Sequence, residues 1–139
     1  MLEQYNSLGL LKPTCLKLSA LKSSILLISS FEHICGGEYE NLDAWADYPG
    51  TIINLPEFDV NKLRHAQEVF KRPILGGLDH RGVLINGTLE EVYAQVDSVL
   101  TKGPKNIIIG ANCTVPDSTA SDRLHAIVEY VHNWRQTHK

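Results

Sequence analysis

Four short runs of mainly apolar residues, each followed by a loop and a helical pattern, constrain most strongly how this chain can fold. They lie at residues 25–28, 51–55, 73–77 and 106–109. Strands of this kind, without alternation of polar and apolar residues, are typical of a parallel sheet that is covered on both faces. The alternation of apolar runs with helical patterns therefore predicts an α/β fold with four parallel strand–helix units.

The segments between these runs carry recognisable helix boundaries. The predicted N-caps are Asn41, Asp59 and Thr88, and the last helix is expected to begin near Ser121. Thr88 and Glu91 have the spacing of a capping box, in which each side chain accepts a hydrogen bond from the other residue's backbone N–H. Gly103 and Pro104 are expected to end the helix that this box begins.

Two architectures fit four such units: a small open α/β sheet, or half of a (β/α)8 barrel. A complete barrel needs eight units and about 250 residues, whereas this chain has 139. The third run is expected to pass into a glycine-rich loop at Gly76 and Gly77. We interpret residues 1–139 as a single domain, in which residues 1–30 show no clear pattern.

Composition excludes several functional classes. The hydrophobic fraction is 43%, the charged fraction is 21% and the formal net charge is -3, which is ordinary for a soluble globular domain and leaves no basic surface for nucleic acid. No apolar run is long enough to cross a bilayer. Three cysteines, an odd number, suit a reducing cytoplasm better than a disulfide framework.

One histidine and two cysteines follow the first and last apolar runs. His33 and Cys35 form a His-x-Cys pair after the first run, and Cys113 follows the fourth. Three such ligands leave one position of a tetrahedral zinc ion open, which is the pattern of catalytic rather than structural zinc. The alternative is that both cysteines are small residues packed beside strand ends, as free cysteines often are.

These residues and three further segments resemble the uroporphyrinogen decarboxylase superfamily, which also includes the methylcobalamin:coenzyme M methyltransferases. The matching segments are His33-Ile34-Cys35-Gly36, Pro73-Ile74-Leu75-Gly76-Gly77-Leu78-Asp79, Gly87-Thr88-Leu89-Glu90-Glu91-Val92 and Ile109-Gly110-Ala111-Asn112-Cys113-Thr114-Val115-Pro116. Their order and spacing cover residues 31–137 and correspond to the C-terminal half of that family's barrel. The resemblance therefore favours the half (β/α)8 barrel.

The resemblance also implies roles for individual residues. The zinc ligands of the methyltransferase branch fall on His33, Cys35 and Cys113. The decarboxylase branch uses no metal and has histidine at the position of Cys113, so Cys113 favours the methyltransferase-like branch. Asp79 matches an acidic residue after the seventh barrel strand and is the candidate catalytic residue, orienting substrate or supporting a ligand. Its alternative role is that of a turn former beside His80 and Arg81.

The function implied by the resemblance is zinc-dependent activation of a thiol for methyl transfer from a corrinoid, which a partner protein would carry. Two alternatives stay open: uroporphyrinogen decarboxylation, and an inactive half-barrel remnant. The family's N-terminal half has no counterpart in this sequence, and residues 29–32 separate the first apolar run from His33. We therefore expect a truncated domain that forms a homodimer or pairs with a missing N-terminal half, because open sheet edges favour association.

Overall fold

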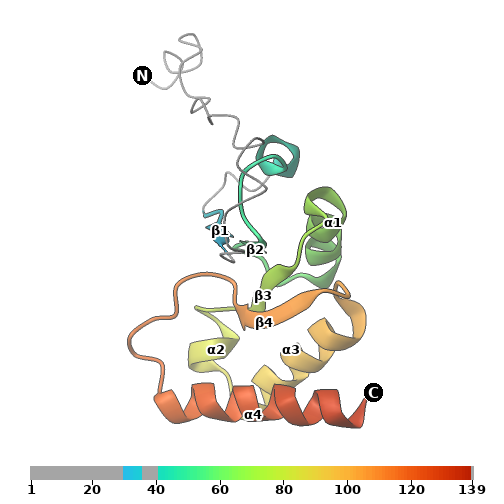
Figure 1. Cartoon of the computed structure of the whole chain (residues 1–139). Coiled ribbons are helices and arrows are strands. Elements are labelled where there is room, and N and C mark those ends of the chain that lie inside the picture. The colour runs from blue at the N-terminus through green and yellow to red at the C-terminus, as the bar shows by residue number, and fades with distance from the viewer. Residues whose placement is uncertain (1–29, 36–40, 139) are drawn as a thin grey trace.

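The structure, a computed structural model, describes residues 30–35 and 41–138. In chain order its elements are β1 (Phe31–His33), the 3-10 helix η3 (Leu42–Trp45), β2 (Ile52–Asn54), α1 (Val60–Phe70), β3 (Ile74–Leu78), α2 (Val83–Asn86), α3 (Leu89–Lys102), β4 (Ile107–Ala111) and α4 (Ser121–Thr137). The four strands pair in parallel in the order β1-β2-β3-β4. Strands alternate with helices along the chain, as the sequence predicts (Figure 1).

The sheet curves, so that residues beyond its two outer strands meet. Neighbouring strands lie about 4.8 Å apart, which would place the outer strands of a flat four-stranded sheet about 14 Å apart. Here the Sγ atoms of Cys35, beyond β1, and Cys113, beyond β4, are 3.8 Å apart. The side chain of Asn54, in β2, also reaches the carbonyl of Ala111, in β4, past the intervening β3. This curvature is that of part of a barrel rather than of an open, flat sheet.

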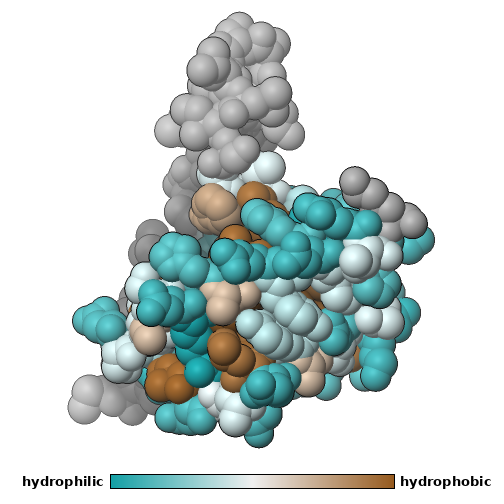
Figure 2. Space-filling model, turned by 90° about the horizontal axis from the view of Figure 1, so that it is seen from below, coloured by the Kyte–Doolittle hydropathy of each residue, from teal (hydrophilic) through white to brown (hydrophobic). Residues whose placement is uncertain are grey.

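Helices α1 and α3 bury their apolar faces against the sheet. Helix α1 contributes Leu63, Ala66 and Phe70 to a cluster around β2 and β3, while Val92 and Val96 of α3 belong to a second cluster with Ile127 of α4. Each fully buried valine or leucine contributes about 1.5–3 kcal/mol through removal of its side chain from water. In Figure 1, α4 runs along the base of the molecule beneath α2 and α3. Seen from below, the surface shows separate hydrophobic patches among hydrophilic residues (Figure 2).

Two of the three predicted helix caps are confirmed. The Asp59 carboxylate accepts hydrogen bonds from the backbone N–H groups of Asn61 and Lys62, at 2.9 and 3.1 Å. The capping box joins Thr88 and Glu91 through hydrogen bonds of 2.7 and 3.2 Å. The third cap is wrong: Asn41 makes no side-chain capping bond, and the segment after it forms only a single 3-10 turn.

The first strand lies later in the chain than expected. Residues 25–28 fall outside the described residues, and β1 instead includes Phe31 and Glu32, which we expected to lie between the strand and His33. Glu32 fits a strand position because its carboxylate lies 3.7 Å from the guanidinium of Arg72. Burial raises the pKa of Glu32, and the charge of Arg72 partly offsets that rise. Parallel pairing places Phe31 opposite Ile52 and brings His33 beside Asn54.

The two glycines after Leu75 lie inside β3 and not in a loop after it. Gly77 has a φ of 96°, which disfavours any residue with a side chain. A Cβ atom at Gly77 would come within 2.9 Å of Val99 in α3. Glycine here therefore allows α3 to pack directly on the strand, and β3 continues to Leu78, one residue before Asp79.

Candidate metal centre

The structure brings His33, Cys35 and Cys113 together at the C-terminal end of the sheet. One potential ligand atom from each residue lies within 4.8 Å of the other two. The Sγ of Cys113 is 3.8 Å from the Sγ of Cys35 and 3.6 Å from Nε2 of His33. Residues separated by 78 positions in the sequence thus meet because β1 and β4 end at the same edge of a curved parallel sheet.

The two separations at Cys113 fit a zinc ion, while the ligand atoms of His33 and Cys35 lie within 4.8 Å of each other. Zinc–sulfur bonds of about 2.3 Å and zinc–nitrogen bonds of about 2.05 Å at tetrahedral angles place two sulfurs about 3.8 Å apart and a sulfur and nitrogen about 3.6 Å apart. The two distances at Cys113 have these values. Thiolate and imidazole are also the ligand types that zinc prefers. The donor set is therefore suited to one zinc ion with an open fourth position.

The exposure of these residues does not support the alternative that the cysteines are packing residues. Cys35 and His33 are exposed, and Cys113 is half-buried. A cysteine that served only as a small hydrophobe would be expected inside the core, as Ile34 is at 2% exposure. The three candidate ligands instead face an accessible end of the sheet.

Asn54, the last residue of β2, contacts the candidate ligand His33. Its Oδ1 lies 2.5 Å from Nδ1 of His33. Its Nδ2 donates hydrogen bonds to the carbonyl oxygens of Leu75 and Ala111, at 2.8 and 3.2 Å. Asn54 is 9% exposed, and its side chain connects β2 with β1, β3 and β4 through partly buried hydrogen bonds.

A second histidine–asparagine pair lies beyond β3 and β4. The Oδ1 of Asn112 accepts a hydrogen bond from the backbone N–H of His80 at 2.9 Å and lies 2.7 Å from Nδ1 of the same residue. Asn112 is 3% exposed and directly precedes Cys113. Sequence reasoning assigned no role to Asn54 or Asn112, although an asparagine at a buried strand end signals a polar group that needs partners.

Asp79 is not a member of the cluster. Its Oδ1 accepts a hydrogen bond from the backbone N–H of Arg81 at 3.2 Å, and its carbonyl accepts one from Leu84 at 3.0 Å. A Cβ atom added at Gly82 would collide with the Asp79 carboxylate, so that carboxylate packs over its own loop. These contacts are those of a turn former. The role of Asp79 in orienting a substrate stays a prediction.

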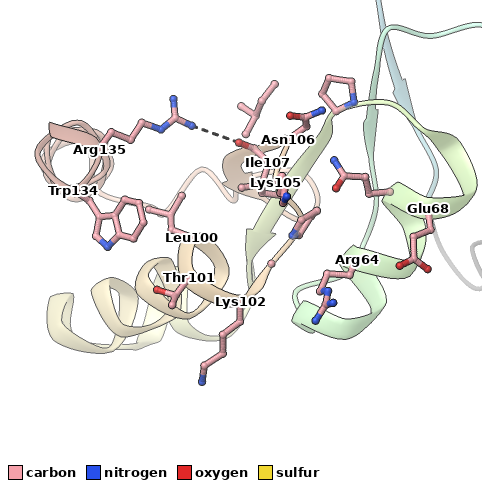
Figure 3. Close-up of a pocket in the computed structure, with 15 residues that line it drawn as sticks. Arg64, Glu68, Leu100, Thr101, Lys102, Lys105, Asn106, Ile107, Trp134 and Arg135 are labelled. Atoms are coloured by element: carbon pink, nitrogen blue, oxygen red, sulfur yellow. Dashed lines mark hydrogen bonds between the residues drawn. The ribbon is translucent and has the colours of Figure 1, made fainter. Parts of the chain in front are cut away.

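A separate hollow of about 1060 Å³ lies at the opposite end of the sheet (Figure 3). It opens beside Ile107, where β4 begins, whereas the candidate metal ligands follow Ala111, where β4 ends. Arg135 of α4 donates a hydrogen bond to the carbonyl of Ile107 across its wall at 3.4 Å. This hollow is therefore separate from the candidate metal ligands, despite its volume.

Comparisons with known proteins place the chain in a family. A profile of the family described as uroporphyrinogen decarboxylase (URO-D) matches residues 12–134, beginning upstream of the region 31–137 expected from the motifs. No curated protein matches the chain. A solved structure of a methyltransferase from Methanosarcina mazei matches with a TM-score of 0.61 and 18% identity.

The match to this structure covers 77% of the present chain but 32% of the methyltransferase chain. At this identity the likeness concerns the fold, and it agrees with part of a (β/α)8 barrel. No helix among the described residues is long and apolar enough to span a membrane. The family match extends over most of the sequence, and the chain therefore belongs to the uroporphyrinogen decarboxylase (URO-D) family.

Proposed function

We propose that this chain is a zinc-binding member of the URO-D family, of the type that activates a thiol for methyl transfer from a corrinoid. The observation that carries the proposal is the agreement of the two distances at Cys113 with a tetrahedral zinc site. The fold-level likeness to a methyltransferase supports it. His33, Cys35 and Cys113 would be the zinc ligands.

The charges of these residues define the chemistry that they would support. One neutral imidazole and two thiolates balance the double charge of zinc, and the fourth position stays free for a substrate. When bound, zinc would favour the deprotonated form of a substrate thiol at neutral pH. Because His33 and Cys35 are exposed, a small thiol can approach this end of the sheet directly.

The transfer itself balances without an oxidant or reductant. A new S–CH3 bond forms on the substrate sulfur while the methyl–cobalt bond of the corrinoid breaks, and both electrons of that bond stay on cobalt. The thiol proton passes to solvent. A corrinoid-carrying protein is the proposed partner, and Asp79 is proposed to orient the thiol substrate. The chain spans about a third of the matched methyltransferase chain.

Methylcobalamin and a panel of small thiols test this proposal. We expect the zinc-loaded protein to accelerate thiol-dependent loss of the methyl–cobalt absorbance. Cys113→Ala should abolish that acceleration because it removes a ligand, whereas Cys15→Ser should preserve it. Cys15 lies outside the matched motifs, so this variant controls for the loss of a thiol.

Two results would count against the proposal. The first is an acceleration that survives Cys113→Ala. The second is metal-independent decarboxylation of a porphyrinogen by the same preparation, which would favour the decarboxylase alternative. Absence of both activities would favour the alternative of an inactive half-barrel remnant.

A further inference from the structure

We infer that Asn54 is a positioning residue that holds the proton of His33 on Nδ1, so that the lone pair of Nε2 is directed toward the two cysteines. A neutral imidazole can bind a metal only through its unprotonated nitrogen, so the position of its proton decides which nitrogen can be a ligand. The inference deepens the proposed function and rests on it for the metal.

The hydrogen bonds of Asn54 fix which end of its amide faces His33. A carbonyl oxygen can only accept a hydrogen bond, and the Leu75 and Ala111 carbonyls both contact the same amide atom, at 2.8 and 3.2 Å. That atom must therefore be the NH2 nitrogen. The remaining amide atom, 2.5 Å from Nδ1 of His33, is consequently the oxygen.

The protonation of His33 follows from this orientation. An amide oxygen carries no proton, so a hydrogen bond between Oδ1 and Nδ1 requires the proton to be on Nδ1 of the neutral ring. Nε2, 3.6 Å from the Sγ of Cys113, is then the unprotonated nitrogen. A partner that fixes the tautomer of a metal-binding histidine is a common feature of zinc sites.

Backbone pairing fixes the position of Asn54 relative to the ligands. Residue 54 lies opposite His33 in the β1–β2 register, and its carbonyl accepts a hydrogen bond from Ile34 at 3.0 Å. Its amide donates hydrogen bonds to carbonyls of β3 and β4, and β4 ends two residues before Cys113. Asn54 therefore links the strand that carries His33 with the strand that precedes Cys113.

The first test is nitrogen-15 NMR of the metal-free protein at about pH 8, where an ordinary histidine is neutral. His33→Gln identifies the His33 signals by their loss. We expect the wild-type ring to carry its proton on Nδ1, and Asn54→Leu, of similar volume but without the amide, to release that preference. The His80–Asn112 pair is an internal control whose tautomer should not change.

The second test compares zinc affinity with stability, using a chromophoric chelator and a denaturant titration. Asn54→Leu should weaken zinc binding by about 10- to 100-fold. Asn54→Asp keeps an acceptor for Nδ1–H but loses both donors to the strand carbonyls. It should therefore unfold more easily than wild type and yet bind zinc more tightly than Asn54→Leu.

A merely structural role predicts instead that affinity falls with stability in both variants, and that result would overturn the inference. A wild-type His33 ring with its proton on Nε2 would also overturn the inference. If the ring is protonated on Nδ1 as expected but the protein binds no zinc, the positioning role stands and the proposed function fails.

Discussion

The carboxylate of Asp79 shows why a residue's place in a motif does not settle its role. It lies on the loop after β3, as the motif implies, but it accepts a hydrogen bond from the backbone N–H of Arg81. Asparagine can accept the same bond and stabilise the same turn without a charge. Substituting it therefore separates the structural role of the residue from its charge.

We expect Asp79→Asn to leave the free energy of unfolding within about 0.5 kcal/mol of wild type. If the charge orients the substrate, thiol-dependent methyl transfer should fall by about tenfold or more in this variant. Unfolding by urea and steady-state methyl-transfer rates are the two measurements. Unchanged stability together with an unchanged rate would leave Asp79 as a turn former only.

The three candidate metal ligands could be predicted because residue type and order in the sequence point to them. Their supporting asparagines could not, because a role for Asn54 depends on which strands lie beside it. Only the structure shows that its amide reaches the carbonyl of Ala111, 57 positions away. The candidate ligands can be read from the sequence, whereas the residues that contact them depend on the curvature of the sheet.

Among the elements, helices α3 and α4 are joined by a polar contact that depends on pH. The Tyr130 hydroxyl donates to both carboxylate oxygens of Asp97, at 2.9 and 3.0 Å, and its ring stacks on Tyr93. The hydrogen bond to Asp97 raises the pKa of Tyr130, with burial and the carboxylate charge adding to it. The protonated tyrosine is therefore favoured in the folded protein.

Because the pKa of Tyr130 is raised in the folded protein, the contribution of this tyrosine to stability is fully present below the ordinary tyrosine pKa of about 10. That contribution is lost as the pH rises through the raised pKa of the folded protein. We expect Tyr130→Phe to cost about 1 kcal/mol of unfolding free energy near neutral pH. The difference from wild type should shrink above about pH 10. Tyr93→Phe is the control, because it keeps the ring that stacks on Tyr130 and leaves the hydrogen bonds between Tyr130 and Asp97 in place. Urea unfolding across this range is the measurement, and a difference independent of pH would contradict the assignment.

The boundaries of helices and strands could be predicted where a local interaction sets them. They could not be predicted where packing between distant elements sets them. The caps at Asp59 and Thr88 depend on residues two or three positions away, so sequence alone locates the starts of α1 and α3. The role of Gly77 within β3 depends instead on packing, because Val99 of α3 occupies the space that a side chain at this position would need. Glycine is a common loop signal, and here that signal was misleading.

For the whole molecule, the open edges of the sheet are the main determinant of association. Strands β1 and β4 each have a neighbour on one side only among the described residues. Exposed apolar side chains include Ile108 of β4, at 38% exposure, and Val128 of α4, at 53% exposure. A shallow apolar groove of about 380 Å³ lies between β4 and α4. Such edges and patches favour pairing with another chain.

We therefore predict a homodimer at micromolar concentration, observable by sedimentation velocity. Val128→Glu places a charge on the exposed apolar surface of α4 and should shift the protein toward monomer while its circular dichroism is preserved. Glu129→Gln, at the adjacent exposed position, is the control and should remain dimeric. A monomeric wild-type profile would contradict the prediction.

The proposed function depends first on whether the chain binds zinc, which its zinc content measures. Protein purified without added metal under reducing conditions is analysed for zinc, beside Cys113→Ser and Cys15→Ser. The proposed centre predicts about one zinc per chain in wild type and in Cys15→Ser, and a large loss in Cys113→Ser because one of three protein ligands is weakened. A folded wild-type protein that takes up no zinc, or a Cys113→Ser variant that binds it equally well, would contradict the three-residue centre.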